Sequence, residues 1–239
     1  MNTWLRIGLI LGCIAGCARV YEEARPGELT GQVLVVWIGP GSDTEGDGRF
    51  IFVPPRDKEQ QLTFHRPVGE NPASLIVPEA IYTDGGSIPR IVQPFKGFNP
   101  WAYAPAYMIH DWLFVARRCL NDGAATEREK GVEGLTFRDS ARILAEVMKT
   151  MKKQEMITRT DLAPAAISSA VTSPASRARW DATGECEAHD RLSADHMQLV
   201  ERLLRDPGQR AVGLMGDDQV ETRARLVTVI EVGAVTDGR

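Results

Sequence analysis

Two neighbouring segments, Tyr82-Thr-Asp-Gly-Gly-Ser-Ile-Pro-Arg90 and Ala106-Tyr-Met-Ile-His-Asp-Trp-Leu-Phe114, mark the point where the chain changes from predicted strands to predicted helices. The first is typical of a loop that leaves a strand, because its paired glycines can adopt positive φ and let another group approach the backbone. The second is predicted to be a helix that begins near Pro105, a residue tolerated in a first helical turn. No other stretch of the sequence brings two carboxylates, a glycine pair, a hydroxyl and a histidine so close together. We therefore place the candidate site where this loop meets this helix.

Strand patterns precede this point. Residues 32–38 and 49–53 are short runs rich in β-branched and aromatic residues and bounded by glycine or proline, as expected of strands. Residues 61–65 alternate between polar and apolar side chains, which is typical of a half-buried strand. A fourth strand, interrupted at Pro78, is predicted within residues 74–83. The N-terminal half should therefore be a small, mostly antiparallel sheet.

Helical patterns dominate the second half of the chain. One helix is predicted over residues 105–118. Thr136 and Asp139 resemble a capping box, and apolar residues recur at helical spacing behind them as far as Met151. The remaining predictions are a charged loop over 121–134, helices over 161–171 and 193–205, and a strand-like run over 226–232. The predicted fold class is α+β, with a small sheet followed by a helical C-terminal half.

The N-terminus resembles the signal of a bacterial lipoprotein. Arg6 provides a positive charge, and an apolar run over residues 7–16 follows it. This run is too short to cross a bilayer, which takes about 20 apolar residues, but it suits the apolar core of a signal peptide. It ends in Ile14-Ala-Gly-Cys17, which resembles a lipobox and implies cleavage before Cys17 and lipidation of its thiol. Ala18 follows the cysteine where other lipoproteins have aspartate, which by the same resemblance implies an outer-membrane protein that faces the periplasm.

The four cysteines fit export. Cys13 would leave with the signal and Cys17 would carry the lipid, so Cys119 and Cys186 would remain in the mature domain. In an oxidising periplasm these two can form a disulfide. The alternatives are two free thiols in a reducing compartment and an N-terminus that is a plain core helix containing cysteines.

The composition limits the partners. With 43% hydrophobic and 25% charged residues, the chain is an ordinary globular protein. Its 28 basic and 32 acidic residues give a net charge of −4, whereas nucleic-acid-binding modules usually have a strong basic excess. We therefore expect no nucleic-acid partner, and a membrane reached through the lipid on Cys17.

Three roles are open for the candidate site. Asp84 and Asp111 could supply oxygen ligands to a divalent cation, with His110 acting as general base toward a water. Ser87 could instead be a nucleophile activated by His110, with Asp84 or Asp111 orienting the imidazole, although the chain has no Gly-x-Ser-x-Gly elbow here. In the third interpretation, His110 and Asp111 are buried structural groups that bond the loop and pin it to the helix. Neighbouring helical side chains diverge by about 100°, so His110 and Asp111 should not readily bond each other.

Three motifs together resemble the domain of unknown function 1353 family of phages, prophages and bacteria. They are the loop that begins at Thr83, the helical His110-Asp-Trp-Leu113 and the later Ser140-Ala-Arg-Ile-Leu-Ala-Glu-Val-Met148, in the family's order and spacing. The resemblance covers roughly residues 33–180. It implies that the family's polar positions fall on Thr83, Asp84, Ser87, Pro89, His110 and Asp111. The third motif departs from the family, because Ala141 stands where the family has aspartate. The family's biochemical role is unassigned, so the resemblance implies a fold and a site more than a reaction.

These observations predict four parts: a signal peptide over 1–16, a tether over 17–30, the family domain over 31–180 and a C-terminal extension over 181–239. The predicted function is that of an envelope lipoprotein that hydrolyses an envelope component. His110 would act as base, and Asp84 and Asp111 would hold a divalent cation or the imidazole. The alternative is a non-catalytic envelope or prophage-encoded accessory lipoprotein, in which the same residues only brace the fold.

Overall fold

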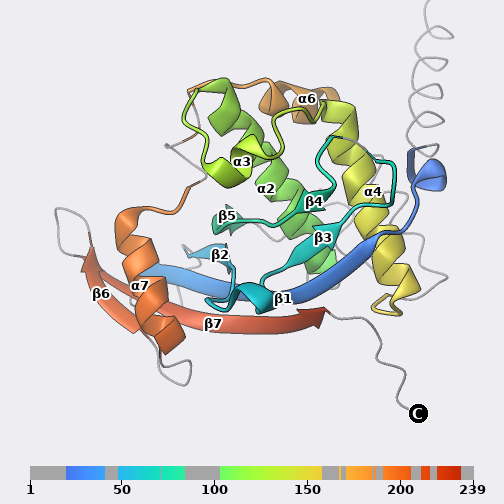
Figure 1. Ribbon diagram of the computed structural model, residues 1–239. Coiled ribbons are helices and arrows are strands. Elements are labelled where there is room, and N and C mark those ends of the chain that lie inside the picture. The colour runs from blue at the N-terminus through green and yellow to red at the C-terminus, as the bar shows by residue number, and fades with distance from the viewer. Residues whose placement is uncertain are drawn as a thin grey trace, which may run out of the picture.

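The structure, a computed structural model, describes residues 20–40, 48–70, 72–83, 103–157, 167, 171–184, 186, 191–205, 211–215 and 220–232. Over these ranges the chain forms a curled sheet with helices packed on it (Figure 1). The predicted α+β class is confirmed. Cys17, Asp84 and Ser87 lie outside the described residues, as does most of the helix predicted over 161–171.

The long strand β1 (Glu28–Pro40) organises the sheet, in which all named strands pair antiparallel. Along one edge it pairs with β7 (Val220–Val232) over residues 31–40. Along the other edge it pairs first with β3 (Thr63–His65) and then with β2 (Arg49–Val53). The outer strands are β4 (Leu75–Ile76) beside β3, β5 (Ile81–Thr83) beside β2 and β6 (Ala211–Met215) beside β7.

β1 changes partner at a glycine. Gly31, between the β3-paired and β2-paired parts of the strand, has a φ of +96°. A Cβ added there would lie 2.2 Å from the Gln61 carbonyl oxygen, so a side chain would meet both backbone strain and a clash. Glycine at this position therefore lets one strand serve two neighbours.

The single interrupted strand predicted over 74–83 is two separate strands. β4 pairs with β3, whereas β5 pairs with β2, so the two lie at different places along the sheet. Pro78 stands between them, and proline cannot donate a hydrogen bond to a strand ladder. The separation matters because it places Thr83, the last residue of β5, within hydrogen-bond distance of Asp111.

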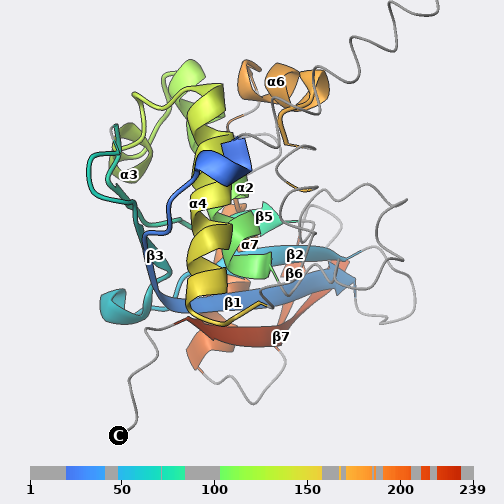
Figure 2. The same ribbon diagram turned by 90° about the vertical axis from the view of Figure 1, so that its right-hand side faces the viewer.

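Helices cover both faces of the sheet (Figures 1 and 2). Val33 and Val35 of β1 belong to the larger core, which also contains the buried sides of α2 (Ala104–Asn121) and α4 (Phe137–Lys153). Val36 and Ile38 point to the other face and form a second core with α7 (Ala194–Arg205). The alternation of faces follows from the two-residue period of a strand.

The helix boundaries reflect local signals. Pro105 lies in the first turn of α2, and the capping box of Thr136 and Asp139 begins α4, both as predicted. The predicted loop over 121–134 contains a further short helix, α3 (Glu127–Lys130), which has a capping box of its own. Four residues are too few to show helical periodicity in a sequence. The remaining helices are α6 (Pro174–Trp180) and the 3-10 turn η1 (Lys58–Gln60).

Both ends of the described chain belong to this one fold. Residues 20–30, predicted to be part of a tether, include a helical turn at 20–23 and the buried Tyr21 and Ala24, and they continue into β1. Their apolar side chains explain why they pack on the domain. β7, predicted as part of an extension, pairs with the central β1. Among the described helices, none has both the length and the apolar character to cross a membrane.

Candidate functional site

The described part of the candidate site lies where the end of β5 meets the middle of α2. His110 and Asp111 stand on α2, and Thr83 ends β5. The Thr83 hydroxyl donates a hydrogen bond to Asp111 Oδ2 at 3.2 Å, which ties the strand to the helix. The structure therefore brings Thr83, His110 and Asp111 together. Asp84 and Ser87, which were predicted to complete the site, fall in the part of the chain that the structure does not describe.

His110 and Asp111 are close but do not form a direct hydrogen bond. The distance from His110 Nδ1 to Asp111 Oδ1 is 3.9 Å, beyond hydrogen-bond length. This agrees with the divergence expected of neighbouring helical side chains. The Asp111 side chain is 27% exposed, whereas the His110 side chain is only 10% exposed. The carboxylate is thus partly open to solvent and the imidazole is almost fully enclosed.

One imidazole nitrogen of His110 has no partner within the described ranges. His110 Nε2 is buried and has no hydrogen-bond partner among the described residues. The ring instead packs against Phe114, with 4.8 Å between ring centroids. Leaving a buried polar atom unpaired costs about 1–3 kcal/mol, so such atoms are uncommon in folded proteins and call for an explanation. Trp112 Nε1 on the same helix is also buried and unpaired within the described ranges.

The described residues do not by themselves make a metal centre. Across those ranges, no three His, Cys, Asp or Glu side chains are grouped so that they could hold a metal ion. His110 and Asp111 can therefore supply two ligands at most. The predicted cation site that pairs Asp111 with Asp84 depends on a residue outside the described ranges.

Aromatic packing and a disulfide fix the C-terminal half of α2. Phe114 packs edge-on against Trp180 of α6, with 5.2 Å between ring centroids, and against Phe137 of α4 at 6.4 Å. Cys119 of α2 forms a disulfide with Cys186, the other cysteine expected to remain in the mature domain. The helix that carries His110 is thus held rigidly from its far end.

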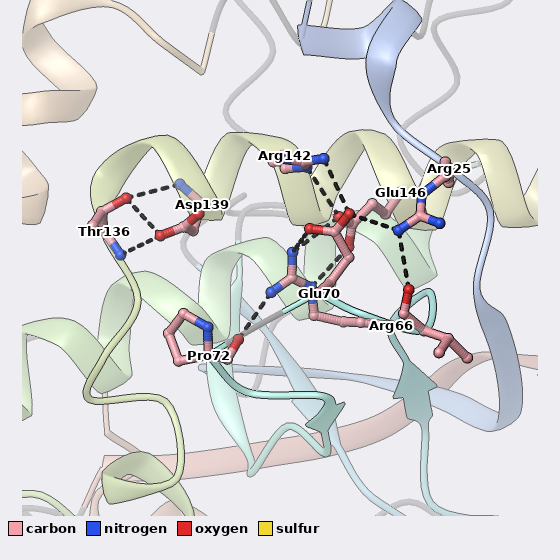
Figure 3. Close-up of polar contacts among 9 residues, drawn as sticks. Arg25, Arg66, Glu70, Pro72, Thr136, Asp139, Arg142 and Glu146 are labelled. Carbon is pink, nitrogen blue, oxygen red and sulfur yellow. Dashed lines mark hydrogen bonds and ion pairs between the residues drawn. The ribbon is translucent and has the colours of Figure 1, made fainter.

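Sequence reasoning missed a buried ion network between β3 and α4 (Figure 3). Arg66 and Glu146 have side chains that are 1% and 0% exposed. Arg66 donates from Nε and Nη2 to the two carboxylate oxygens of Glu146 at 2.8 and 2.9 Å, and from Nη1 to the Pro72 carbonyl oxygen at 2.9 Å. Burial raises the pKa of the Glu146 carboxyl, and hydrogen bonding from Arg66 opposes that rise.

A second carboxylate extends this network to the surface. Glu70 Oε1 accepts hydrogen bonds from Arg142 and Arg25, each at 3.0 Å. Arg66 and Glu146 are 80 residues apart in the sequence, so no local pattern could have paired them. We call Arg25, Arg66, Glu70, Arg142 and Glu146 the ion brace.

A further polar contact holds α7 to the sheet. The Tyr82 hydroxyl and His196 Nδ1 are 2.7 Å apart, and the Ser193 backbone N–H donates to the same hydroxyl at 3.3 Å. Because that oxygen already accepts from Ser193, the simplest arrangement has Tyr82 donating to a neutral His196. Burial, together with the nearby positive charge of Arg49, lowers the pKa of His196. Tyr82 and His196 are 114 residues apart in the sequence, so no local pattern predicts this contact.

Comparison with known proteins assigns the central part of the chain. Residues 59–162 match the family described as "Protein of unknown function (DUF1353)". This segment is a DUF1353 domain. The match begins later and ends earlier than the resemblance in the sequence suggested, but it includes Thr83, His110, Asp111 and the motif that ends at Met148. Neither a curated protein nor a solved structure matches the chain.

Proposed function

We propose that this DUF1353 domain is a hydrolase in which His110 is the general base and Asp111 orients its imidazole. One observation carries the proposal: His110 Nε2 is buried without a hydrogen-bond partner among the described residues, while Nδ1 faces a carboxylate. A histidine that only braced the fold would be expected to have its ring nitrogens paired.

The position of Asp111 assigns roles to the two ring nitrogens. A carboxylate beside Nδ1 favours the tautomer with its proton on Nδ1, which leaves the lone pair on Nε2. This is the arrangement by which an acidic residue orients a catalytic histidine. The present separation of 3.9 Å is long, and catalytic hydrogen bonds often tighten only when substrate binds. Thr83 restrains Asp111 through its other carboxylate oxygen.

The proposed chemistry is the transfer of one proton. Nε2 takes a proton from water, the hydroxide attacks a carbonyl or phosphoryl centre, and the proton passes to the leaving group. Since Nε2 is enclosed in this structure, the substrate-bound form has to admit a water to it. Asp84 directly follows Thr83 in the sequence, and consecutive Cα atoms are about 3.8 Å apart. We therefore keep Asp84 as the partner of Asp111 in holding a divalent cation or the imidazole, and Ser87 as a further candidate in the same loop.

We also propose that the protein is a lipoprotein of the bacterial outer membrane, held by lipid on Cys17 and facing the periplasm. The lipobox-like Ile14-Ala-Gly-Cys17 supports the anchor. The disulfide between Cys119 and Cys186 supports export, because disulfides persist mainly in oxidising compartments. On this proposal the substrate is a component of the cell envelope.

The test compares two conservative substitutions on the same helix. His110→Gln removes the proposed base, and Trp112→Phe removes a different buried N–H, one without a partner among the described residues, and leaves the proposed chemistry untouched. Both proteins and the wild type are assayed on ester, amide and phosphodiester substrates, including peptidoglycan fragments and phospholipids. We expect His110→Gln to lower hydrolysis about 10²- to 10⁴-fold and Trp112→Phe to leave it within a factor of about three.

The stability of the same variants shows whether His110 acts as a general base or only stabilises the fold. If His110 only braces the fold, His110→Gln should lower the free energy of unfolding by about 1–3 kcal/mol, with no hydrolysis detected in the wild type. That pair of results would reject the hydrolase in favour of an accessory protein.

Calorimetric titration of the wild type and Asp111→Asn with Mg²⁺, Ca²⁺, Mn²⁺ and Zn²⁺ tests the proposed role of Asp111 as a cation ligand. Binding lost in the variant supports that role, and absence of binding to the wild type removes it.

A further inference from the structure

The residues that follow the proposed lipid site are fastened to α4. We call residues 20–29 the N-terminal strap. Lys149 of α4 lies over the Tyr21 ring, 4.9 Å from its centroid, and its ammonium donates to the Glu22 carbonyl oxygen at 3.3 Å. Further along, the Gly27 N–H donates to Thr150 Oγ1 at 2.8 Å. Figures 1 and 2 both show this segment, in blue, lying along α4. The strap is thus a fixed part of the domain.

This attachment leaves almost no free chain for a tether. After the proposed cleavage before Cys17, three residues precede the strap: Cys17, Ala18 and Arg19. An extended residue spans at most about 3.6 Å, so lipid on Cys17 would lie within roughly 10 Å of the folded surface. A flexible tether of the predicted length, residues 17–30, would have let the domain move freely above the bilayer. A strap bound to α4 prevents that.

The loop between β3 and β4 lies at the same corner of the molecule. Its Val68 is 93% exposed, the highest value among the exposed large hydrophobic side chains of the described ranges. Arg25 of the strap donates to the Val68 carbonyl oxygen at 3.1 Å and to Glu70 of the same loop at 3.0 Å. A fully exposed apolar side chain therefore stands beside the segment that follows the lipid.

The exposed side of α4 is strongly basic. Five cationic residues fall within one face of the helix at its 100° rotation per residue. They are Arg138, Arg142, Lys149, Lys152 and Lys153. The one carboxylate that α4 exposes, Asp139, is engaged in the capping box. Arg142 is already paired with Glu70 and Glu146 of the ion brace. Exposed Glu155 follows α4, and exposed Glu22 and Glu23 lie on the strap beside it, so these carboxylates reduce the charge of the face in part. A basic face is notable in a chain of net charge −4, and anionic lipid headgroups attract such faces.

We propose that the mature protein sits directly on the bilayer, with the N-terminal strap, the Val68 loop and the basic face of α4 against the headgroups. This seating rests on the proposed lipidation of Cys17. The partner is the surface of an anionic bilayer. Because the connection is short, the lipid would restrict the orientation of the domain relative to the bilayer as well as hold it there.

The test uses two labelled forms of the mature lipidated protein, which no longer contains Cys13. The mature lipidated protein is reconstituted in phosphatidylglycerol-containing vesicles that carry a headgroup spin label. A fluorophore is attached at Val68→Cys or at Val229→Cys. Val229 is a matched control, because its side chain is 45% exposed. Val229 pairs with Leu34 of β1 and so shares its face of the sheet. Val33 and Val35, on either side of Leu34, point to the face covered by α2 and α4. Val229 therefore lies on the opposite face of the sheet from α4. The native disulfide and the lipidated Cys17 leave only the new thiol to react.

We expect the spin label to quench the probe at Val68 at least threefold more strongly than the probe at Val229. Inserting about ten Gly and Ser residues between Arg19 and Val20 should bring the two values together, since such linkers behave as flexible coils. Equal quenching at both sites in protein shown by mass spectrometry to carry lipid would overturn the seating and leave the anchor standing. Quenching at Val68 unchanged by the linker would overturn the role of the short connection. Absence of lipid on Cys17 would reject the anchor and the seating together.

Discussion

The ion brace and the candidate site are both polar clusters set against the same core, but they differ in how completely their atoms are paired. In the brace, Arg66 uses Nε, Nη1 and Nη2 in hydrogen bonds to Glu146 and the Pro72 carbonyl. In the candidate site, His110 Nε2 has no partner among the described residues, and Nδ1 stands 3.9 Å from Asp111. The Arg66 guanidinium at the centre of the brace has every nitrogen hydrogen-bonded, whereas His110 keeps a ring nitrogen with no partner among the described residues.

This difference separates two uses of buried polar groups. A saturated network holds segments together, and breaking it should cost stability. An unsatisfied group is a cost to stability that persists when it serves another purpose. Substitutions in the brace should therefore change folding and leave chemistry alone, and substitutions in the site should do the reverse. The following predictions test that contrast, from the largest expected effect to the smallest.

The brace should give the largest loss. Arg66→Met leaves the buried Glu146 carboxylate without its main partner and should lower the free energy of unfolding by about 3–5 kcal/mol. Urea denaturation measures the loss. The double variant Arg66→Met/Glu146→Leu should regain most of it, because replacing a whole buried pair with apolar groups is often neutral. A single-variant loss below about 1 kcal/mol would contradict the role given to the brace.

Removing the disulfide should give the second-largest loss of stability. Replacing Cys119 and Cys186 by alanine removes a cross-link between positions 67 residues apart, and losing such a link typically costs about 2–4 kcal/mol. Thermal denaturation of the double variant and of the reduced wild type should give similar lowered midpoints. Equal midpoints for the oxidised and reduced wild type would show that the bond contributes nothing.

The contact between β5 and α2 should matter less for folding than for the site. Thr83→Val deletes the hydrogen bond to Asp111 at nearly constant volume and should cost about 0.5–1.5 kcal/mol. Any hydrolysis should fall more steeply than stability, because Asp111 loses a restraint. Thr83→Ser keeps the hydroxyl and is the matched control. A Thr83→Val protein with full activity would remove Thr83 from the site.

The contact between Tyr82 and His196 of α7 should have the smallest effect on stability, and that effect should depend on pH. The pKa of His196 is lowered in the folded protein, so folding favours the neutral imidazole. The stability that depends on this neutral form is present above pH 6.5, the ordinary value, and is lost as the pH falls below it toward the folded pKa. Urea midpoints between pH 7.5 and 5 should show a small decline in the wild type and a flatter profile in His196→Gln. Identical profiles would contradict the assignment.

Much of the fold was readable from local patterns, and the missed parts have physical reasons. β2, the start of α4 and the course of α2 were predicted because turn residues, a capping box and a first-turn proline act on neighbouring residues. α3 and α6 are too short to show a helical period. The joining of β7 to β1 depends on contacts nearly 200 residues apart, which no local pattern records.

The candidate site was located by sequence but not completed by the structure. The helix pattern placed His110 and Asp111 together, and the loop motif pointed to the end of β5, where Thr83 contacts Asp111. The ion brace and the Tyr82 contact with His196 join residues 80 and 114 apart, so only the folded chain brings them together. Asp84 and Ser87 stay predictions, because they lie outside the described residues.

The state of the His110 imidazole is the most direct test of the contrast between brace and site. Nitrogen-15 NMR of histidine-labelled protein reports which ring nitrogen carries the proton, and His110→Gln identifies the signal. We expect the neutral ring to carry its proton on Nδ1, beside Asp111, and to have an unprotonated Nε2 without a hydrogen-bond partner. A neutral ring with its proton on Nε2, and with the shift of a hydrogen-bonded donor, would make His110 a structural residue and contradict the proposed base.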